Sequence, residues 1–268
     1  MRLDASGKVS LDHIYTAPDP RTYFQALRPL GYRVPQLAKP CFDKLIKEYR
    51  ETEQVAVPRI LDIGCSYGIN AALLKYDATM DELYARYDGS GPASRAALLE
   101  RDRDLSRSRR PAHGLRFTGL DASTSALAYA HEAGFLDDTV HADLEANDPT
   151  PEQRGLLAGT DLVISTGCIG YVTERTLIRV VRAQDGRLPW MAHFVLRMFP
   201  FDPVGKALAE LGYRTVRVDE VFKQRRFAGP EEQRGVLDGM AAAGVDASGL
   251  EEDGWLYAQL YLSWPQHP

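Results

Sequence analysis

The chain has 268 residues, of which 44% are hydrophobic and 26% are charged, as expected of one globular domain. No apolar run is long enough to span a bilayer and the N-terminus lacks a signal-peptide core, so we expect a cytoplasmic protein without a membrane partner. The net charge of −5 disfavours a nucleic-acid partner, because phosphate binding needs concentrated positive charge. Cys41, Cys65 and Cys168 are scattered and odd in number, which predicts free thiols. His-x-x-x-His and Cys-x-x-Cys pairs are absent, so no metal site is expected.

Residues 1–57 precede the first predicted strand and form an N-terminal arm. Residues 12–24 are rich in turn formers and aromatic side chains. Residues 40–49 have the spacing of an amphipathic helix. The apolar face of that helix consists of Phe42, Leu45, Ile46 and Tyr49.

Residues 59–75 predict a short buried strand, a turn that contains glycines and an apolar helix. Gly64 and Gly68 frame the turn, where glycine tolerates positive φ and lets the backbone approach a ligand. Open α/β sheets bind nucleotides in the crevice outside the carboxyl ends of their parallel strands. This segment therefore indicates an adenosine-type cofactor.

The connection from this helix to the next strand is too long for a simple turn, so residues 76–114 are predicted to be a helical insertion. In its second half, three acids, Glu100, Asp102 and Asp104, interleave with five arginines. This mixture favours a solvated helix or a homo-oligomer contact over a nucleic-acid surface. Topology predicts that the insertion lies at the sheet edge opposite the cofactor crevice and does no chemistry. The arginines are Arg101, Arg103, Arg107, Arg109 and Arg110.

Six further strands are predicted after the insertion, and a helix is predicted from Asp202 to Gly212. Acids end the first three strands of the chain, at Asp62, Asp121 and Asp143. Ala122 follows the second of these acids and leads into an alanine-rich helix. The order of the strands does not follow from the sequence. The six segments are 116–121, 139–144, 161–167, 190–197, 213–218 and 255–263.

The pattern Asp62-x-Gly64-x-x-x-Gly68 differs from the G-x-G-x-x-G spacing of dinucleotide sites. It resembles the first motif of the class I S-adenosylmethionine-dependent methyltransferases, and the resemblance covers about residues 59–264. It implies an α/β, Rossmann-like domain over residues 58–268, with a seven-stranded, mostly parallel sheet, an antiparallel last strand and helices on both faces. It also implies S-adenosylmethionine as the cofactor and an N-terminal helical arm that serves as a lid. The middle glycine of the family motif is Ser66 here, so we expect the loop to sit differently against the methionine half of the cofactor.

The resemblance also assigns roles to the residues at the strand ends. It gives the methionine amino group to Asp62, the ribose to Asp121, and the adenine amine to Asp143 with the Leu144 amide. An alternative for Asp143 is that it caps the following turn, and an alternative for Cys65 is that it is a small packing residue. The expected cofactor-binding residues are Asp62, Gly64, Cys65, Ser66, Gly68, Asp121, Ala122, Asp143, Leu144 and Thr166.

Tyr15 in the arm and Tyr171, just beyond the fourth strand, are the expected catalytic residues. The fourth strand lacks the Asn-Pro-Pro-Tyr tetrapeptide of enzymes that methylate DNA bases or glutamine. It also lacks the acid of the metal-dependent catechol methyltransferases. Other aromatic residues of the arm either hold a sulfonium cation or pack the arm onto the core. These residues are Tyr23, Phe24 and Tyr32, and further options for catalysis are His13, Arg197 and His193, of which His193 is better explained as a core residue.

The favoured function is therefore methyl transfer to an oxygen, nitrogen or carbon of a small metabolite. One alternative is an enzyme that cyclises the cofactor to azetidine-2-carboxylate and methylthioadenosine, which Ser66 and an aromatic lid would suit. Another is a binding or regulatory protein that keeps the cofactor pocket without turnover. A nicotinamide-dependent dehydrogenase is disfavoured by the glycine spacing.

Overall fold

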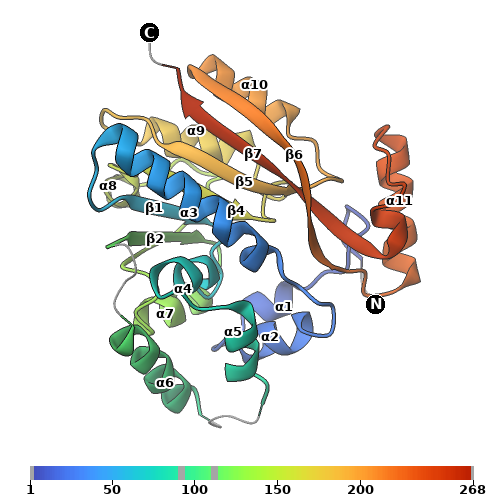
Figure 1. Ribbon diagram of the computed structural model, residues 1–268, viewed down its shortest axis with the longest axis horizontal. Helices are drawn as coiled ribbons and strands as arrows, with labels where there is room; N and C mark the ends of the chain where they lie inside the picture. The colour runs from blue at the N-terminus through green and yellow to red at the C-terminus, as the bar shows by residue number, and fades with distance from the viewer. Residues whose placement is uncertain (1–2, 90–93, 110–113, 267–268) are drawn as a thin grey trace.

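The computed structural model describes residues 3–89, 94–109 and 114–266, in which seven strands form one sheet (Figure 1). The strands are β1 (Arg59–Ile63), β2 (Arg116–Asp121), β3 (Asp138–His141), β4 (Leu162–Thr166), β5 (Trp190–Leu196), β6 (Tyr213–Arg226) and β7 (Trp255–Pro265). Their order is β3-β2-β1-β4-β5-β7-β6, and β7 is antiparallel to both of its neighbours. The other neighbouring strands are parallel. The predicted seven-stranded Rossmann-like fold is confirmed.

Helices cover both faces of this sheet, and Figure 1 shows the longest of them, α3, lying across it. One face packs against α3, α4 and α7, and the other packs against α8, α9 and α10. None of the described helices is long and apolar enough to cross a membrane. The helices are α1 (Asp12–Tyr15), α2 (Arg21–Leu27), α3 (Val34–Glu53), α4 (Ile69–Lys75), α5 (Met80–Arg86), α6 (Arg95–Ser108), α7 (Thr124–Glu132), α8 (Pro151–Leu157), α9 (Glu174–Arg182), α10 (Asp202–Glu210), α11 (Pro230–Ala242) and the short 3₁₀ helix η1 (Glu251–Asp253).

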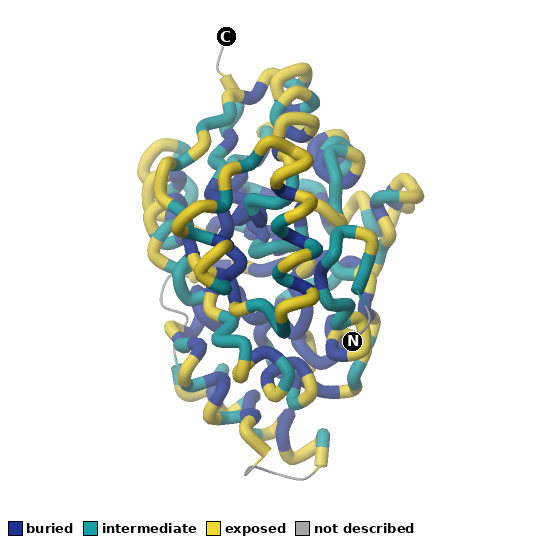
Figure 2. Tube along the Cα trace, turned by 90° about the vertical axis from the view of Figure 1, so that its right-hand side faces the viewer, coloured by how far each residue is buried: buried dark blue, intermediate teal, exposed yellow. Residues whose placement is uncertain are grey.

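The central strand β1 shows why the sheet is covered on both sides. Its side chains alternate, so Ile60 joins the core under α3 and α4, whereas Leu61 and Ile63 join the core under α9 and α10. All three are at most 1% exposed. Figure 2 shows the buried residues running through the interior and the exposed residues on the outer helices. A strand of this kind appears in the sequence as a continuous apolar run.

Two predicted strand boundaries differ from the structure, with consequences for the site. β3 ends at His141, so Asp143 follows the strand instead of ending it. β6 continues to Arg226, well past the predicted end at residue 218, with register shifts against β7 near Val221 and Arg225. The charged residues around 219–220 interrupt the apolar alternation and hide the second half of the strand.

The N-terminal arm shares the core of the sheet. Ile14, Tyr23 and Phe24 are each at most 3% exposed and belong to the same apolar cluster as Ile60 of β1. The start of the arm runs beside α11, where Glu232 accepts a hydrogen bond from the Val9 amide (2.9 Å). The sequence did not predict α11.

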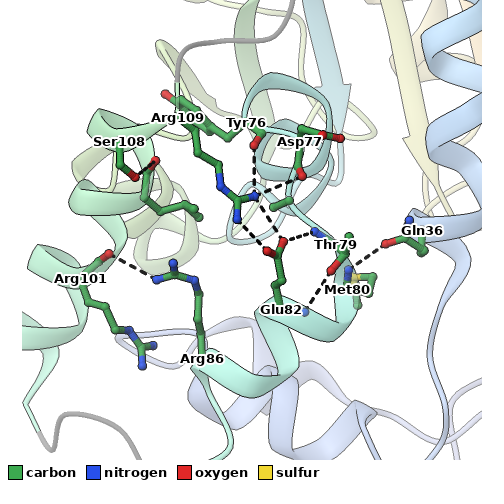
Figure 3. Close-up of polar contacts among 12 residues, drawn as sticks. Gln36, Tyr76, Asp77, Thr79, Met80, Glu82, Arg86, Arg101, Ser108 and Arg109 are labelled. Carbon is green, nitrogen blue, oxygen red and sulfur yellow. Dashed lines mark hydrogen bonds and ion pairs between the residues drawn. The ribbon is translucent and has the colours of Figure 1, made fainter.

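The insertion folds as α5 and α6, and a network of polar contacts closes it (Figure 3). Thr79 and Glu82 form a capping box at the start of α5. Arg109, after α6, points back to Glu82 and also donates to the carbonyl oxygens of Tyr76 and Asp77. The arginines of α6 and the residue after it pair with acids of the insertion, namely Arg103 and Arg107 with Glu100, Arg107 with Asp104, and Arg109 with Glu82. Arg110 lies outside the described residues.

The insertion reaches the arm, so the prediction that it stays at the opposite edge of the sheet was wrong. The ring of Phe24 stacks on Tyr87 with centroids 4.6 Å apart, and the Tyr84 hydroxyl donates to the Tyr32 carbonyl (2.6 Å). Tyr84 of α5 and Tyr87, the residue after it, make these contacts, whose partner could not be predicted from the sequence. The insertion therefore supports the arm from outside.

Candidate functional site

A cavity of about 600 Å³ lies between the carboxyl ends of the parallel strands and the N-terminal arm. It includes the boundary between β1 and β4, where the strand order reverses and α/β sheets bind ligands. No described residue of the insertion lines it. The lining residues are 63–66, 69, 70, 120–123, 142–145, 166–168, 171, 172 and 176 from the sheet side, 4, 8–12, 15, 16, 23, 27, 32 and 35 from the arm, and 224 and 225 from β6.

The turn after β1 has the backbone that its glycines predict. Gly64 and Gly68 have φ of 67° and 74°, and a Cβ on Gly64 would lie 2.7 Å from the Cβ of Cys168. Ser66 also has positive φ, at 49°, and its amide donates to the Asp121 carboxylate (2.8 Å). The Ser66 hydroxyl is buried, and it has no hydrogen-bond partner in the described part of the chain. The turn therefore presents one unused polar atom to the cavity.

Asp62 does not reach the cavity wall, and Asn70 of α4 stands in front of it. The Asn70 amide nitrogen donates to both oxygens of Asp62 (3.1 and 3.2 Å) and also to the Thr166 hydroxyl (3.2 Å). Burial raises the pKa of Asp62 to about 8. The Asn70 side-chain oxygen is buried without a partner among the described residues. Asp62 thus orients Asn70, and Asn70 offers the hydrogen-bond acceptor.

Asp121 ends β2 and lines the cavity directly. Its two carboxylate oxygens accept from the amides of Ser66 and Ser123, both at 2.8 Å. Burial raises the pKa of this carboxyl group above its usual value. A carboxylate has more lone pairs than these backbone amides use, so the group can still accept a hydrogen bond from a ligand hydroxyl. Ala122 lies beside it in the cavity wall.

Asp143 caps the turn that follows it, which was the alternative interpretation of this acid. One of its oxygens accepts from the amides of Glu145 (3.0 Å) and Ala146 (3.1 Å). Asp143 and the buried Leu144 nevertheless line the cavity. The second carboxylate oxygen of Asp143 is therefore available to a ligand.

Tyrosines of the arm form an aromatic wall of the cavity. Tyr23 meets Tyr15 and Tyr32 edge to face, with ring centroids 5.8 and 6.2 Å away. All three line the cavity, whereas Phe24 does not and packs against the insertion. Burial raises the pKa of Tyr15 to about 12, so its hydroxyl stays protonated at neutral pH.

Tyr171 lies after β4, and its ring is half exposed. Its hydroxyl donates to a carboxylate oxygen of Asp4 in the arm (2.7 Å). Burial raises the pKa of this hydroxyl as well. Tyr171 therefore lines the cavity and ties the arm to the β4 side of the sheet.

The other candidate catalytic residues lie outside the cavity. His193 is fully buried, with Nδ1 2.8 Å from the Ser165 hydroxyl, and burial lowers its pKa to about 3. It is a neutral core residue, as predicted. Arg197 pairs with Glu251, and His13 lies on α1 outside the cavity lining. Among the described residues, no group of His, Cys, Asp or Glu is arranged to hold a metal ion.

Sequence reasoning missed several polar residues of the cavity wall, among them Lys8, Asn70, Gln224 and Arg225. Gln224 is buried with an unpartnered side-chain oxygen, and a Cβ at Gly167 would lie 2.8 Å from its amide nitrogen. Arg225 makes two hydrogen bonds to Glu232 (2.6 and 3.0 Å). The signal for Asn70 was its place in the first turn of the helix that follows the glycine turn.

No protein-family model matches this sequence, and no match was found among curated proteins. Solved structures match at low similarity. The cyclase SpnF has 15% identity and a TM-score of 0.42, over 84% of this chain and 82% of that one. A methyltransferase from Geobacter sulfurreducens, solved with S-adenosyl-L-homocysteine, has 14% identity and a TM-score of 0.37, over 84% and 91%. A TehB-like methyltransferase from Corynebacterium glutamicum has 14% identity and a TM-score of 0.39, over 82% and 86%.

The sheet itself gives the firmer assignment. Its strand order, its antiparallel β7 and a cavity at the reversal of strand order all come from this chain alone. By these features, the chain has the Rossmann-like fold of the class I methyltransferases that its sequence resembles.

Proposed function

We propose that this protein is an S-adenosylmethionine-dependent enzyme that transfers a methyl group to a small metabolite. The observation that carries the proposal is a buried, unpartnered acceptor, the Asn70 side-chain oxygen, in a cavity that also contains Asp121. The hydroxyl of Ser66 is a second unpartnered buried atom in the same wall. A ligand with an α-ammonium group and a ribose would supply hydrogen-bond donors to all of these acceptors.

Each part of the cofactor has a proposed position. Asn70 and Ser66 would accept hydrogen bonds from the methionine ammonium, with Asp62 behind Asn70 holding the orientation of its amide. Asp121 would accept from the ribose hydroxyls, and Asp143 with the Leu144 amide would hold the adenine amine. Gly64, Cys65, Ala122 and Thr166 would shape the wall around them. Gly68, also expected to bind the cofactor, lies outside the cavity lining and directly precedes α4, with positive φ.

The chain's own side chains have limited tasks in this reaction. When bound, S-adenosylmethionine supplies a methyl group that its sulfonium activates. Tyr15, Tyr23 and Tyr32 would face the cation with their ring electrons and exclude water. The Tyr171 hydroxyl is engaged by Asp4, so we expect it to position the arm instead of removing a proton. The acceptor's lone pair would attack the methyl carbon, the carbon–sulfur electrons would leave with sulfur, and the proton of the acceptor would pass to solvent.

A second reaction is the alternative proposal, because Ser66 carries a buried, unpartnered hydroxyl where the resembled family has a glycine. In this reaction the amino nitrogen of the cofactor attacks its own γ-carbon and loses a proton to solvent. The carbon–sulfur bond breaks, which gives azetidine-2-carboxylate and methylthioadenosine. Ser66 and the tyrosine wall are both compatible with a folded methionine tail.

Two experiments test the proposal. Calorimetry should detect binding of S-adenosylhomocysteine and none of NAD, and absence of binding to both S-adenosylmethionine and S-adenosylhomocysteine would overturn it. Incubation with S-adenosylmethionine alone, followed by nucleoside analysis, separates the two reactions. Methylthioadenosine formed without an acceptor identifies the cyclase, whereas S-adenosylhomocysteine formed only with an acceptor mixture identifies the methyltransferase. Binding without turnover under both conditions identifies a regulatory protein.

A further inference from the structure

Lys8 is a buried cation that the proposed cofactor contacts do not use. The residue is 7% exposed and lines the cavity. Its ammonium nitrogen lies 5.0 Å from the ring centroid of Tyr171 and 5.8 Å from that of Phe199. Within the described residues, this nitrogen forms no ion pair and no hydrogen bond. Lysine is rarely buried in proteins unless it is paired, so Lys8 requires an explanation.

The acids beside Lys8 already have other partners. Asp4 accepts from the Tyr171 hydroxyl (2.7 Å) and from both the amide (2.9 Å) and the hydroxyl (2.6 Å) of Ser6. Glu232 is held by two hydrogen bonds from Arg225 and by the amides of Val9 and Ala228. Neither acid forms an ion pair with the Lys8 ammonium, so its positive charge is available to a ligand in the cavity.

The charged surroundings of Lys8 come from four elements. Burial and Arg225 of β6 lower its pKa to about 8, while Asp4 of the arm and Glu232 of α11 oppose that shift. Tyr171, which follows β4, is uncharged at neutral pH because burial raises its pKa. Lys8 is therefore mostly protonated at pH 7, and an anion beside it would be stabilised by a partly desolvated charge.

We propose that Lys8 binds an anionic group, of the carboxylate type, on a ligand in the arm end of the cavity. The proposal rests on the proposed function for the identity of the cavity's ligands, and it deepens that function by naming a charge that a ligand must carry. Two sources of the anion share this chemistry. One is the methionine carboxylate of the cofactor, and the other is a carboxylate on the methyl acceptor.

The test uses the full-length protein with Lys8→Met, which removes the charge at similar length, and Lys8→Arg, which keeps it. Lys44→Met is the matched control, because Lys44 is an exposed lysine of α3 outside the cavity. The first pair of probes is S-adenosylhomocysteine and its decarboxylated analogue, S-adenosyl-3-thiopropylamine. The second pair is benzoate and neutral benzamide, added to the protein with and without S-adenosylhomocysteine.

If the anion belongs to the cofactor, Lys8→Met lowers the affinity for S-adenosylhomocysteine about tenfold or more and leaves the affinity for the decarboxylated analogue unchanged. If the anion belongs to the acceptor, Lys8→Met leaves S-adenosylhomocysteine unchanged and removes the binding of benzoate but not of benzamide. Lys8→Arg and Lys44→Met retain binding in either case. Equal affinities of wild type and Lys8→Met for all four probes would overturn the proposal.

The pH dependence gives a second readout. Anion binding to wild type should weaken as pH rises through about 8, because Lys8 loses its proton there. Lys8→Arg should bind the same probe with no such decline, because arginine stays charged. This comparison also removes the contribution of Asp62, which titrates in the same range. If wild type binds no S-adenosylhomocysteine, the proposed function fails, while benzoate without that ligand still tests Lys8.

Discussion

At the scale of single residues, the site depends on pairs in which one side chain orients another. Asp62 is buried behind Asn70 and fixes the direction of its amide, because both oxygens of Asp62 accept hydrogen bonds from the Asn70 amide nitrogen. The Asn70 oxygen must then face away from Asp62. Asp121 has the corresponding role for the turn, since it holds the Ser66 amide while its remaining lone pairs stay open. The positions of the Asn70 oxygen and the Asp121 carboxylate are thus fixed before any ligand binds.

We predict that Asn70→Ala lowers the affinity for S-adenosylhomocysteine about tenfold or more, because it removes the side-chain oxygen that would accept a hydrogen bond from the ammonium group. Methylthioadenosine lacks the amino acid part, so its affinity should stay within about twofold of wild type. Calorimetry with both ligands measures the difference. Equal losses for both ligands would show that Asn70 does not act on the ammonium.

Asp121→Asn should weaken the binding of both ligands, unlike Asn70→Ala. It removes the charge and one hydrogen-bond acceptor from the expected ribose position, so the affinities for S-adenosylhomocysteine and for methylthioadenosine should both fall about tenfold or more. The two variants together map the two halves of the cofactor. Selective loss of S-adenosylhomocysteine alone in Asp121→Asn would contradict the assignment of the ribose.

The raised pKa of Asp62 predicts a pH-dependent stability. Its folded pKa of about 8 lies above the ordinary value of 3.8, so the folded state holds the proton more tightly than the unfolded chain. Its contribution to stability is therefore fully present below about pH 4 and is lost as pH rises toward 8, by at most about 1.4 kcal/mol per pH unit.

Urea unfolding of wild type and Asp62→Asn tests this expectation. The difference in free energy of unfolding should move in favour of the variant as pH rises between these two values, because asparagine has no charge to bury. A difference that does not change with pH would mean that Asp62 keeps an ordinary pKa in the folded protein.

The predictable part of the site is the part that local sequence controls. Gly64, Gly68 and Asp121 follow apolar strands in the order in which a parallel sheet presents them. Lys8 and Gln224 have no such signal, because their place in the cavity depends on β6 and the arm meeting across the sheet. The length of β6 was itself hidden by charged residues on an edge strand.

At the scale of elements, the arm is held over the cavity by side chains of the sheet domain. The Tyr67 hydroxyl donates to the carbonyl oxygens of Ile14 (3.1 Å) and Ala17 (2.8 Å). The Ser123 hydroxyl donates to the carbonyl of Tyr15 (2.6 Å). The insertion presses on the arm from outside through Tyr87. The arm is therefore held in place by contacts on two sides, from the sheet domain and from the insertion.

Tyr67→Phe should loosen the arm while keeping the ring in the core. We expect a loss of about 1 kcal/mol in unfolding free energy, a few-fold weaker binding of S-adenosylhomocysteine and faster amide exchange in residues 12–17. Tyr76→Phe is the matched control, because its hydroxyl donates to the Gly134 carbonyl (2.6 Å), far along the chain from the arm. Equal exchange in the arm of both variants would contradict the role of Tyr67.

At the scale of the whole molecule, the arm and the sheet share one apolar cluster, although the sequence suggested a lid in front of a separate domain. Ile14 and Phe24 of the arm, Ile60 of β1 and Leu83 of the insertion all belong to it. A cluster that joins three segments makes their unfolding cooperative. The cavity lies within the region that this cluster supports, so a ligand there binds a surface that exists only when all three segments are folded.

We therefore predict that S-adenosylhomocysteine stabilises the whole chain in one transition. At a concentration of about 100 times its Kd, a ligand that binds only the folded state adds about 2.7 kcal/mol. Hydrogen exchange in denaturant should show α2 and β1 gaining the same protection, because one opening event exposes both. A lid that opens independently would instead leave α2 exchanging faster than β1 and gaining protection at a different ligand concentration. That result would separate the arm from the folding unit, in spite of the core that it shares with the sheet.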